Sequence, residues 1–146
     1  MLINGKGYVS LDDREYHYYL KDHQGNNRVL VNKNGGVEEI NHYYPFGGIF
    51  ASEENVQPYK YNGKELDTKK GLNWYDYGAR RYDAALGRFT TVDPSSEKYY
   101  PTSPYVYCGG NPINRIDPTG GIGIETNMVI IIGSKRELMS LKDGLL

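Results

Sequence analysis

The sequence has a single cysteine, Cys108, and a single tryptophan, Trp74, among 146 residues. One cysteine excludes a disulfide within the chain, so cysteine usage gives no information on the redox compartment. An excess of charge of one sign is also lacking, because 17 basic and 18 acidic residues give a formal net charge of −1. This balance gives no electrostatic basis for binding nucleic acid or an anionic membrane surface, and we expect neither as a partner.

Long apolar runs are absent too. The longest aliphatic run, Met128 to Ile132, is far shorter than the ~20 residues that span a bilayer. Residues 1–10 have no basic stretch followed by an apolar run, so no signal peptide is expected in this chain. The three histidines, His17, His23 and His42, are too scattered to form a metal site. We expect them to be exposed on strands or turns, and we expect no metal and no cofactor.

Glycine and tyrosine are abundant, with 18 and 15 residues. Tyrosine favours the half-buried surface of a sheet, and glycine favours the tight turns between strands. The composition therefore predicts a mainly β chain of antiparallel hairpins. Packing between strands is the ordinary role of such tyrosines, and a stacking platform for sugars or bases is the alternative. Cys108 is expected to be a small buried apolar residue.

The first half of the chain predicts a meander of three strands. Their expected bounds are Tyr16–Leu20, Arg28–Asn32 and Val37–Tyr44. Residues 22–27 have the composition of a turn, and Asn34-Gly35 favours a type I′ hairpin turn. Shorter strands are expected at 59–61, 72–77 (with Trp74 in the core), 80–83 and 87–92. The likeness of Asp22…Gly25…Arg28 to Asp83…Gly87-Arg88 suggests a reused strand-turn-strand unit.

The last third of the chain changes character. Five of the seven prolines lie in residues 93–121, which predicts an irregular segment with a short helical turn near 105–108. Met128 to Ile132 then reads as a buried strand. Ser134 and Glu137 fit a capping box before a helix whose apolar face carries Leu138, Leu141 and Leu145.

Four blocks of sequence resemble the RHS repeat-associated core domain. They are Tyr59-Lys60-Tyr61-Asn62-Gly63-Lys64-Glu65, Leu72 to Asp83, Gly87 to Pro94, and Ser103 to Gly120. A weaker likeness extends back to about Tyr19, so that about two-thirds of the chain is covered. The order of the blocks argues against chance similarity.

The resemblance implies the end of a bacterial shell built from a curled RHS/YD-type sheet, with a proline-rich plug and a short strand-helix tail. It implies an RHS-core-like β domain over 1–121 and a variable tail over 122–146, which is an effector stub or the truncated start of a toxin. Polymorphic toxins of this kind are secreted or lie at the cell surface. The implied partners are the chain's own C-terminal effector segment, an immunity protein and the remaining RHS shell. Exposed sheet edges add self-association to these expectations.

The resemblance also implies self-cleavage, since several relatives cut themselves just after an Asp-Pro-x-Gly motif as aspartic proteases. Asp93 and Asp117 are the candidate dyad, and Arg80 matches the family's functional arginine. The implied cleavage region is Gly120, Gly121 and Ile122. Two carboxylates that hydrolyse a peptide must lie close enough to share a proton, because repulsion between them then keeps one protonated.

The chain departs from the family pattern in three respects. A shell normally takes several hundred residues, Gly121 stands where leucine is usual, and Ser96 stands where glycine follows the first Asp-Pro. Asp-Pro is also a common turn dipeptide whose side chain bonds the nearby backbone. The sequence therefore leaves two functions open, a self-cleaving shell end and a non-catalytic β-scaffold or surface binding module.

Overall fold

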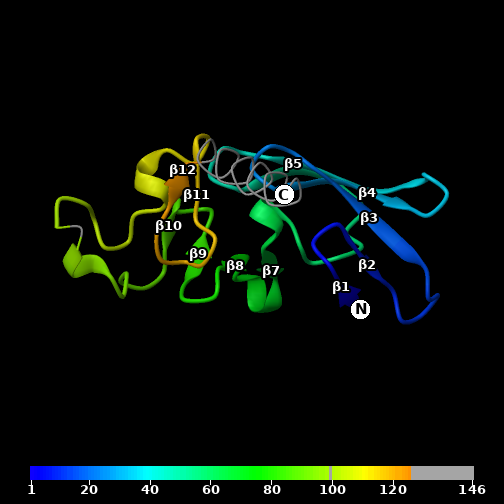
Figure 1. Cartoon of the computed structure of the whole chain (residues 1–146), viewed down its shortest axis with the longest axis horizontal. Coiled ribbons are helices and arrows are strands. Elements are labelled where there is room, and N and C mark those ends of the chain that lie inside the picture. Colours follow the sequence, from blue (N-terminus) through cyan, green and yellow to red (C-terminus); the bar gives the residue numbers. More distant parts are fainter. Residues whose placement is uncertain (99, 126–146) are drawn as a thin grey trace, which may run out of the picture.

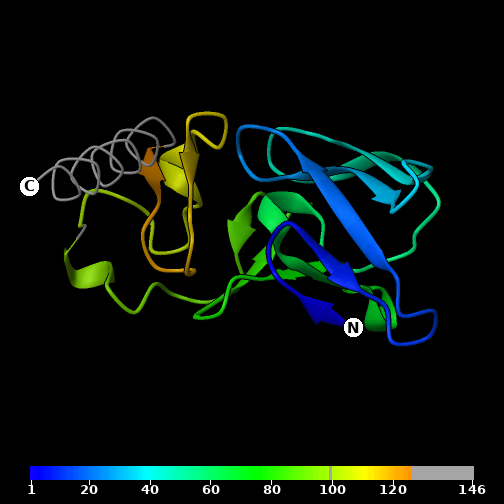
Figure 2. The same ribbon diagram turned by 45° about the vertical axis from the view of Figure 1, so that its right-hand side comes forward.

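The computed structural model describes residues 1–98 and 100–125 (Figure 1). This part of the chain is mainly β, as predicted, with antiparallel strands in three sheets and helical structure limited to single 3-10 turns. The six-stranded sheet lies toward one end of the long axis of the molecule, and the two smaller sheets lie toward the other end (Figures 1 and 2). The predicted strand at Met128 to Ile132 and the helix after Ser134 lie outside the described residues.

The first sheet has six strands in chain order, each antiparallel to its neighbour. They are β1 (Leu2–Ile3), β2 (Gly7–Val9), β3 (Tyr16–Lys21), β4 (Asn27–Asn32), β5 (Val37–Tyr43) and β6 (Ile49–Glu53). The three predicted strands of the meander correspond to β3, β4 and β5. β1 and β6 form the edges of this sheet.

Three hairpins of this sheet share one turn geometry. In the turns 22–26, 32–36 and 44–48, the amide of the fourth residue, a glycine, donates to the carbonyl of the first at 2.8–3.0 Å. That glycine has a positive φ in each turn, and at Gly35 it is +82°. Asn34 has no positive φ, so the predicted type I′ turn is wrong. A three-residue loop that closes on a left-handed glycine takes its place.

The second sheet has four strands and the third has two. The second contains β7 (Glu65–Asp67), β8 (Trp74–Asp76), β9 (Arg81–Asp83) and β10 (Arg88–Phe89), and the third contains β11 (Arg115–Ile116) and β12 (Ile124–Glu125). The strand expected at 59–61 is wrong, because Tyr59 makes one isolated bridge and Tyr61 begins a 3-10 turn. The expected turn near 105–108 lies slightly later, at Cys108–Gly110.

The core of the second sheet is built from tyrosine. Its buried residues are Tyr61, Tyr75, Tyr77, Tyr82, Phe89, Tyr107 and Cys108. The rings meet in tilted and edge-to-face pairs with centroids 4.2–6.4 Å apart, the arrangement that aromatic quadrupoles favour. Packing is thus the role of these tyrosines. Trp74, expected in the core, is only half-buried, and its neighbour Tyr75 lies inside instead.

The two larger sheets are joined through the turn between β5 and β6. The hydroxyls of Tyr61, Tyr82 and Tyr75 donate to the carbonyls of the successive residues Pro45, Phe46 and Gly47, at 2.9, 2.6 and 3.0 Å. These bonds satisfy three backbone acceptors that would otherwise be buried without a partner. They also explain the use of tyrosine at positions where phenylalanine would fill the same space.

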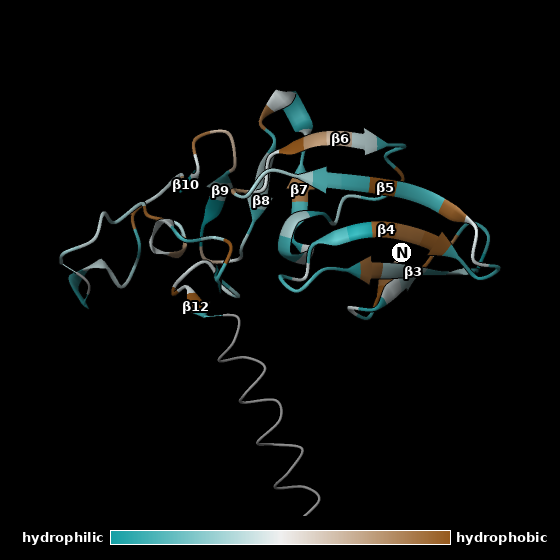
Figure 3. Cartoon of the chain, turned by 90° about the horizontal axis from the view of Figure 1, so that it is seen from above, coloured by the Kyte–Doolittle hydropathy of each residue, from teal (hydrophilic) through white to brown (hydrophobic). Residues whose placement is uncertain are grey.

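The six-stranded sheet buries a polar face. His17, Glu39 and Asn41 point inward, whereas Tyr18 and Leu20 are exposed on the other face. Apolar stretches of β3 and β4 are visible in Figure 3. The expectation that His17 is exposed was wrong, because the ring is 6% exposed, stacks on Tyr8 and lies 2.6 Å from Glu38 through Nδ1.

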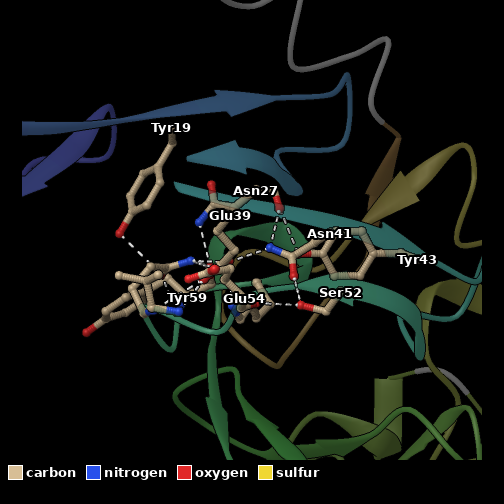
Figure 4. A network of polar contacts seen from close by, with 11 residues as sticks. Tyr19, Asn27, Glu39, Asn41, Tyr43, Ser52, Glu54 and Tyr59 are labelled. Atoms are coloured by element: carbon tan, nitrogen blue, oxygen red, sulfur yellow. Dashed lines mark hydrogen bonds and ion pairs between the residues drawn. The ribbon is translucent and has the colours of Figure 1, made fainter. Parts of the chain in front are cut away.

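The inward polar groups form one network around Glu39 (Figure 4). The Glu39 carboxylate is paired with the buried Lys60 ammonium and also accepts hydrogen bonds from Asn41, from the Val56 amide and from Gln57. Burial alone raises the pKa of Glu39, but the bonds from Lys60 and Asn41 outweigh it, so that the pKa is lowered. This network fixes the segment before β7 against β5.

Candidate functional site

The candidate site is organised around the buried guanidinium of Arg80. This residue ends the turn between β8 and β9, where the Tyr77 amide donates to the Arg80 carbonyl. Its side chain is 2% exposed, and the guanidinium carbon lies 3.6 Å from the centre of the Phe89 ring. The flat contact with the ring fixes the plane of the guanidinium and therefore the direction of its N–H groups.

Those N–H groups bind the backbone of two distant segments. Nε donates to the Gly120 carbonyl at 2.6 Å and Nη2 to the Gly121 carbonyl at 3.2 Å. Nη1 donates to the Pro104 carbonyl at 3.2 Å. Arg80 thus holds Gly120 and Gly121 of the predicted cleavage region and ties them to the proline-rich segment at Pro104.

The same nitrogen, Arg80 Nη2, lies beside both candidate carboxylates. It is 3.5 Å from Asp93 Oδ2 and 3.9 Å from Asp117 Oδ2. The two oxygens can therefore be no farther apart than the sum of those distances. The fold brings together the three residues that the sequence selected, Arg80, Asp93 and Asp117, although they are far apart in the sequence.

Asp117 is buried and divides its two oxygens between two tasks. Oδ1 accepts hydrogen bonds from the amides of Thr119, Gly120 and Gly121 at 2.7–3.2 Å, while Oδ2 faces Arg80. Gly120 is required in this turn, because its φ is +77° and a Cβ would lie 2.9 Å from the Arg80 amide nitrogen. Asp117 therefore closes the turn that its Asp-Pro sequence indicates, and the same turn directs its second oxygen toward Arg80.

Asp93 follows the same pattern with more exposure. Its Oδ1 accepts from the Ser95 amide at 2.7 Å, and its own amide donates to the Pro104 carbonyl. Its side chain is 15% exposed, against 1% for Asp117. The two carboxylates therefore differ in environment, which is the condition for dividing acid and base roles between them.

A pocket of about 240 Å³ opens beside these groups. It is lined by the three site residues, by both sides of the predicted cleavage point, and by residues of the proline-rich segment, among them Pro104, Val106, Cys108, Arg115, Gly121 and Ile122. The volume is sufficient for several water molecules. A hydrolytic water thus has space next to the Gly121 carbonyl.

Electrostatics favour a charged arginine and an inert cysteine at this site. Burial lowers the pKa of Arg80, and the two neighbouring carboxylates Asp93 and Asp117 oppose that effect. An arginine remains protonated under such a shift. Burial raises the pKa of the Cys108 thiol to about 12, so it lacks the thiolate character of a nucleophile. Its burial also confirms the prediction that it acts as a small apolar residue.

Sequence reasoning missed the supporting residues of the site. Phe89, Pro104 and Arg115 line or orient it, yet nothing in their local sequence marks them for that role. Of the neighbouring Arg80 and Arg81, only Arg81 is exposed. Among residues 1–98 and 100–125, no group of three or more histidine, cysteine or acidic side chains could hold a metal ion.

Comparison with solved structures identifies this arrangement of strands. The chain matches the crystal structure of TcdB2-TccC3 with a TM-score of 0.66 and 24% identity, over 73% of this chain and 5% of that one. It matches the structure of a Photorhabdus luminescens Tc holotoxin pore equally well, again over 73% of this chain and 5% of that one. The chain has the fold of a segment of a toxin complex. At this identity the likeness shows the fold alone.

Curated relatives fit the same family. The chain is 36% identical over 126 residues to Salivary gland surface protein 1 of Aedes aegypti, and 34% identical over 96 residues to Toxin subunit YenC2 of Yersinia entomophaga. It is 30% identical over 120 residues to the putative uncharacterized protein YibJ of Escherichia coli K12. No family model matches the chain. These matches fit the RHS and toxin family that the sequence resemblance named.

The chain spans less than half the length of each of these curated relatives. The match to the Aedes protein includes 84% of this chain but only 4% of that protein. The chain spans 47% of YibJ and 10% of the Yersinia subunit. No helix in the described part of the chain is long and apolar enough to cross a membrane.

Proposed function

We propose that this chain is the C-terminal part of a bacterial RHS-type shell that encloses or presents a C-terminal effector, and that it cuts itself between Gly121 and Ile122. The supporting observation is the position of Arg80, which contacts the Gly121 carbonyl and lies beside both Asp93 and Asp117. The toxin-complex fold supports the shell role. The partners are the effector segment, an immunity protein and the rest of the shell, in a secreted or surface-exposed assembly.

The geometry supports a division of labour in the proposed reaction. The guanidinium of Arg80 polarises the Gly121 carbonyl and stabilises the negative charge that develops on its oxygen. One aspartate takes a proton from a water in the pocket, and the other donates a proton to the Ile122 nitrogen as the bond breaks.

Intact mass of the purified chain tests this proposal. We expect two fragments that separate at the Gly121–Ile122 bond, and a full-length mass for Asp93→Asn and for Asp117→Asn. Asp76→Asn is the matched control, because Asp76 is an aspartate on β8 that lies outside the pocket and pairs with Arg81 at the surface. A full-length mass that persists in the unmodified chain would reject self-cleavage and leave the shell role standing alone.

The second candidate is a non-catalytic β-scaffold or cell-surface binding module. It is favoured by the turns at Asp93 and Asp117, where each side chain already bonds the backbone next to it. It predicts a full-length mass for all four proteins and lower thermal stability for both site variants. The control Asp76→Asn would then keep the stability of the parent chain.

A further inference from the structure

Arg115 is the second arginine of the pocket, and no contact explains its position. It lies at the start of β11, is partly buried, and lines the same pocket as Arg80, Asp93 and Gly121. Within the described part of the chain, its side chain forms no hydrogen bond, ion pair or ring contact. A partly buried guanidinium that makes no such contact is unfavourable unless it meets an anion at some stage.

The other sheltered arginines contrast with Arg115. Arg28 pairs with Asp22, and Arg80 lies beside two carboxylates. Glu125 stands opposite Arg115 in the β11–β12 ladder, but it is exposed and its carboxylate does not come within 4.0 Å of the guanidinium. The pocket therefore contains a cation whose nearest cross-strand carboxylate is not engaged.

Cleavage as proposed above would create the missing anion. Water adds its oxygen to the Gly121 carbonyl carbon, the bond to the Ile122 nitrogen breaks, and both water protons end on the new amino group. The products are an α-carboxylate on Gly121 and an α-ammonium on Ile122. The original oxygen already faces Arg80, so the new oxygen must come from the pocket side, which Arg115 lines.

We infer that Arg115 binds the carboxylate that self-cleavage creates on Gly121 and keeps it in the site; this inference rests on the proposed function. Without Arg115, three carboxylates would gather around the single guanidinium of Arg80, and their repulsion would expel the new chain end. With Arg115, two guanidinium groups balance them. Arginine suits this role, because its planar N–H groups match a carboxylate.

Oxygen exchange provides a readout that a purely structural role would not change. An acid that stays beside the two aspartates is attacked by water repeatedly, and each cycle adds a water oxygen and removes one oxygen as water through a tetrahedral triol. Protein that has finished cutting in ordinary water is transferred to H₂¹⁸O, and the fragment ending at Gly121 is examined by mass spectrometry. Any label enters after cleavage and reports only on the retained carboxylate.

We expect ¹⁸O to enter the Gly121 carboxylate of the parent chain. Arg115→Gln should still cut, but its label should enter at least about tenfold more slowly, the factor expected when a charged hydrogen bond is lost. Arg115→Lys retains the positive charge and should recover part of the exchange. Arg14→Gln is the matched control, because Arg14 is exposed and lies outside the pocket.

The possible results separate the inference from the proposed function. A parent chain that never cuts rejects the proposed function and this inference with it. A parent chain that cuts but takes up no label, or an Arg115→Gln chain that exchanges as fast as the parent, overturns only the role of Arg115. A folded Arg115→Gln chain that fails to cut also overturns it, because Arg115 would then act before the carboxylate exists.

Discussion

Single side chains at the site perform more than one task, and Arg80 shows this most clearly. One guanidinium contacts the Phe89 ring, three carbonyls and two carboxylates. A lysine has no planar fork and cannot reach these groups together. The stability of the site and the proposed self-cleavage therefore depend on the same guanidinium, and an experiment on Arg80 must measure folding and cleavage separately.

Arg80→Lys should slow self-cleavage by about 100-fold, the effect of losing one donor to a developing oxyanion. The rate is followed by intact mass, and circular dichroism shows whether the variant is folded. Arg81→Lys is the control, since this neighbour makes only a surface ion pair with Asp76. Equal rates for Arg80→Lys and the parent would show that Arg80 only supports the fold.

Glu39→Gln should destabilise the chain by about 3–5 kcal/mol, because it leaves the Lys60 ammonium buried without its counter-charge. Both side chains are at most 2% exposed. Urea unfolding measures the loss. Glu53→Gln at the edge strand β6 is the control, because its side chain is exposed and the change should be within about 0.5 kcal/mol.

The same pair predicts how stability depends on pH. The pKa of Glu39 is lowered in the folded chain, so its contribution is fully present above the unfolded value of about 4.3. That contribution is lost as the pH falls through the lower folded value. Urea midpoints measured downward from pH 6 should decline more in the parent than in Glu39→Gln, and parallel declines would argue against this pair as the cause.

No local sequence pattern marks the residues that complete these two clusters. Asp93, Asp117 and Arg80 were found through motif resemblance, and the fold places them together. Glu39 and Lys60 follow the alternation of ordinary strand residues, so burying a charged pair was not predictable from pattern alone. Their pairing depends on the course of the chain between β5 and β7, which local sequence does not encode.

The hairpins were easier to predict than their turns. Alternating apolar and polar residues located β3, β4 and β5 to within one residue at most ends, because period-two patterns mark half-buried strands. The Asn-Gly pair pointed to the wrong turn, since a third loop residue shifts the left-handed position onto glycine alone. The length of a hairpin loop depends on the register between its two strands, and the Asn-Gly pair alone does not determine that register.

Two of these turns provide a matched pair of glycine variants. Gly35→Ala and Gly47→Ala both place alanine at positive φ, which costs about 1–2 kcal/mol. At Gly35 nothing lies within 4 Å of the added Cβ, whereas at Gly47 it would be 2.5 Å from the Tyr61 ring. Gly47→Ala should therefore lose more stability in urea unfolding, and equal losses would show that the Tyr61 ring moves aside freely.

At the scale of the whole molecule, two turns of the six-stranded sheet join it to the core of the four-stranded sheet. At the first turn, Asn62 donates its amide N–H to Asn26 Oδ1 and its side-chain N–H to the Gln24 carbonyl. The β5–β6 turn belongs to the six-stranded sheet, while the tyrosines that bind its carbonyls belong to the core of the four-stranded sheet. The buried Glu39–Lys60 pair joins the same two regions. The first sheet also contacts the segment that carries the site, because Gln24 of the turn between β3 and β4 donates to the Pro112 carbonyl, shortly before β11 and Asp117.

Removing the tyrosine hydroxyls should therefore separate the unfolding of the two sheets. Tyr82→Phe leaves the Phe46 carbonyl without its donor and should cost about 1–3 kcal/mol. The combined change at Tyr61, Tyr75 and Tyr82 to phenylalanine preserves ring packing but removes all three hydrogen bonds to the turn.

We expect one cooperative unfolding transition in the parent and two in the triple variant, with hydrogen exchange rising first in the six-stranded sheet. Tyr18→Phe, on the exposed face of β3, is the control and should retain a single transition. A single transition in the triple variant, shifted only to lower denaturant, would mean that ring packing, the Glu39–Lys60 pair and the hydrogen bonds from Asn62 suffice to couple the sheets.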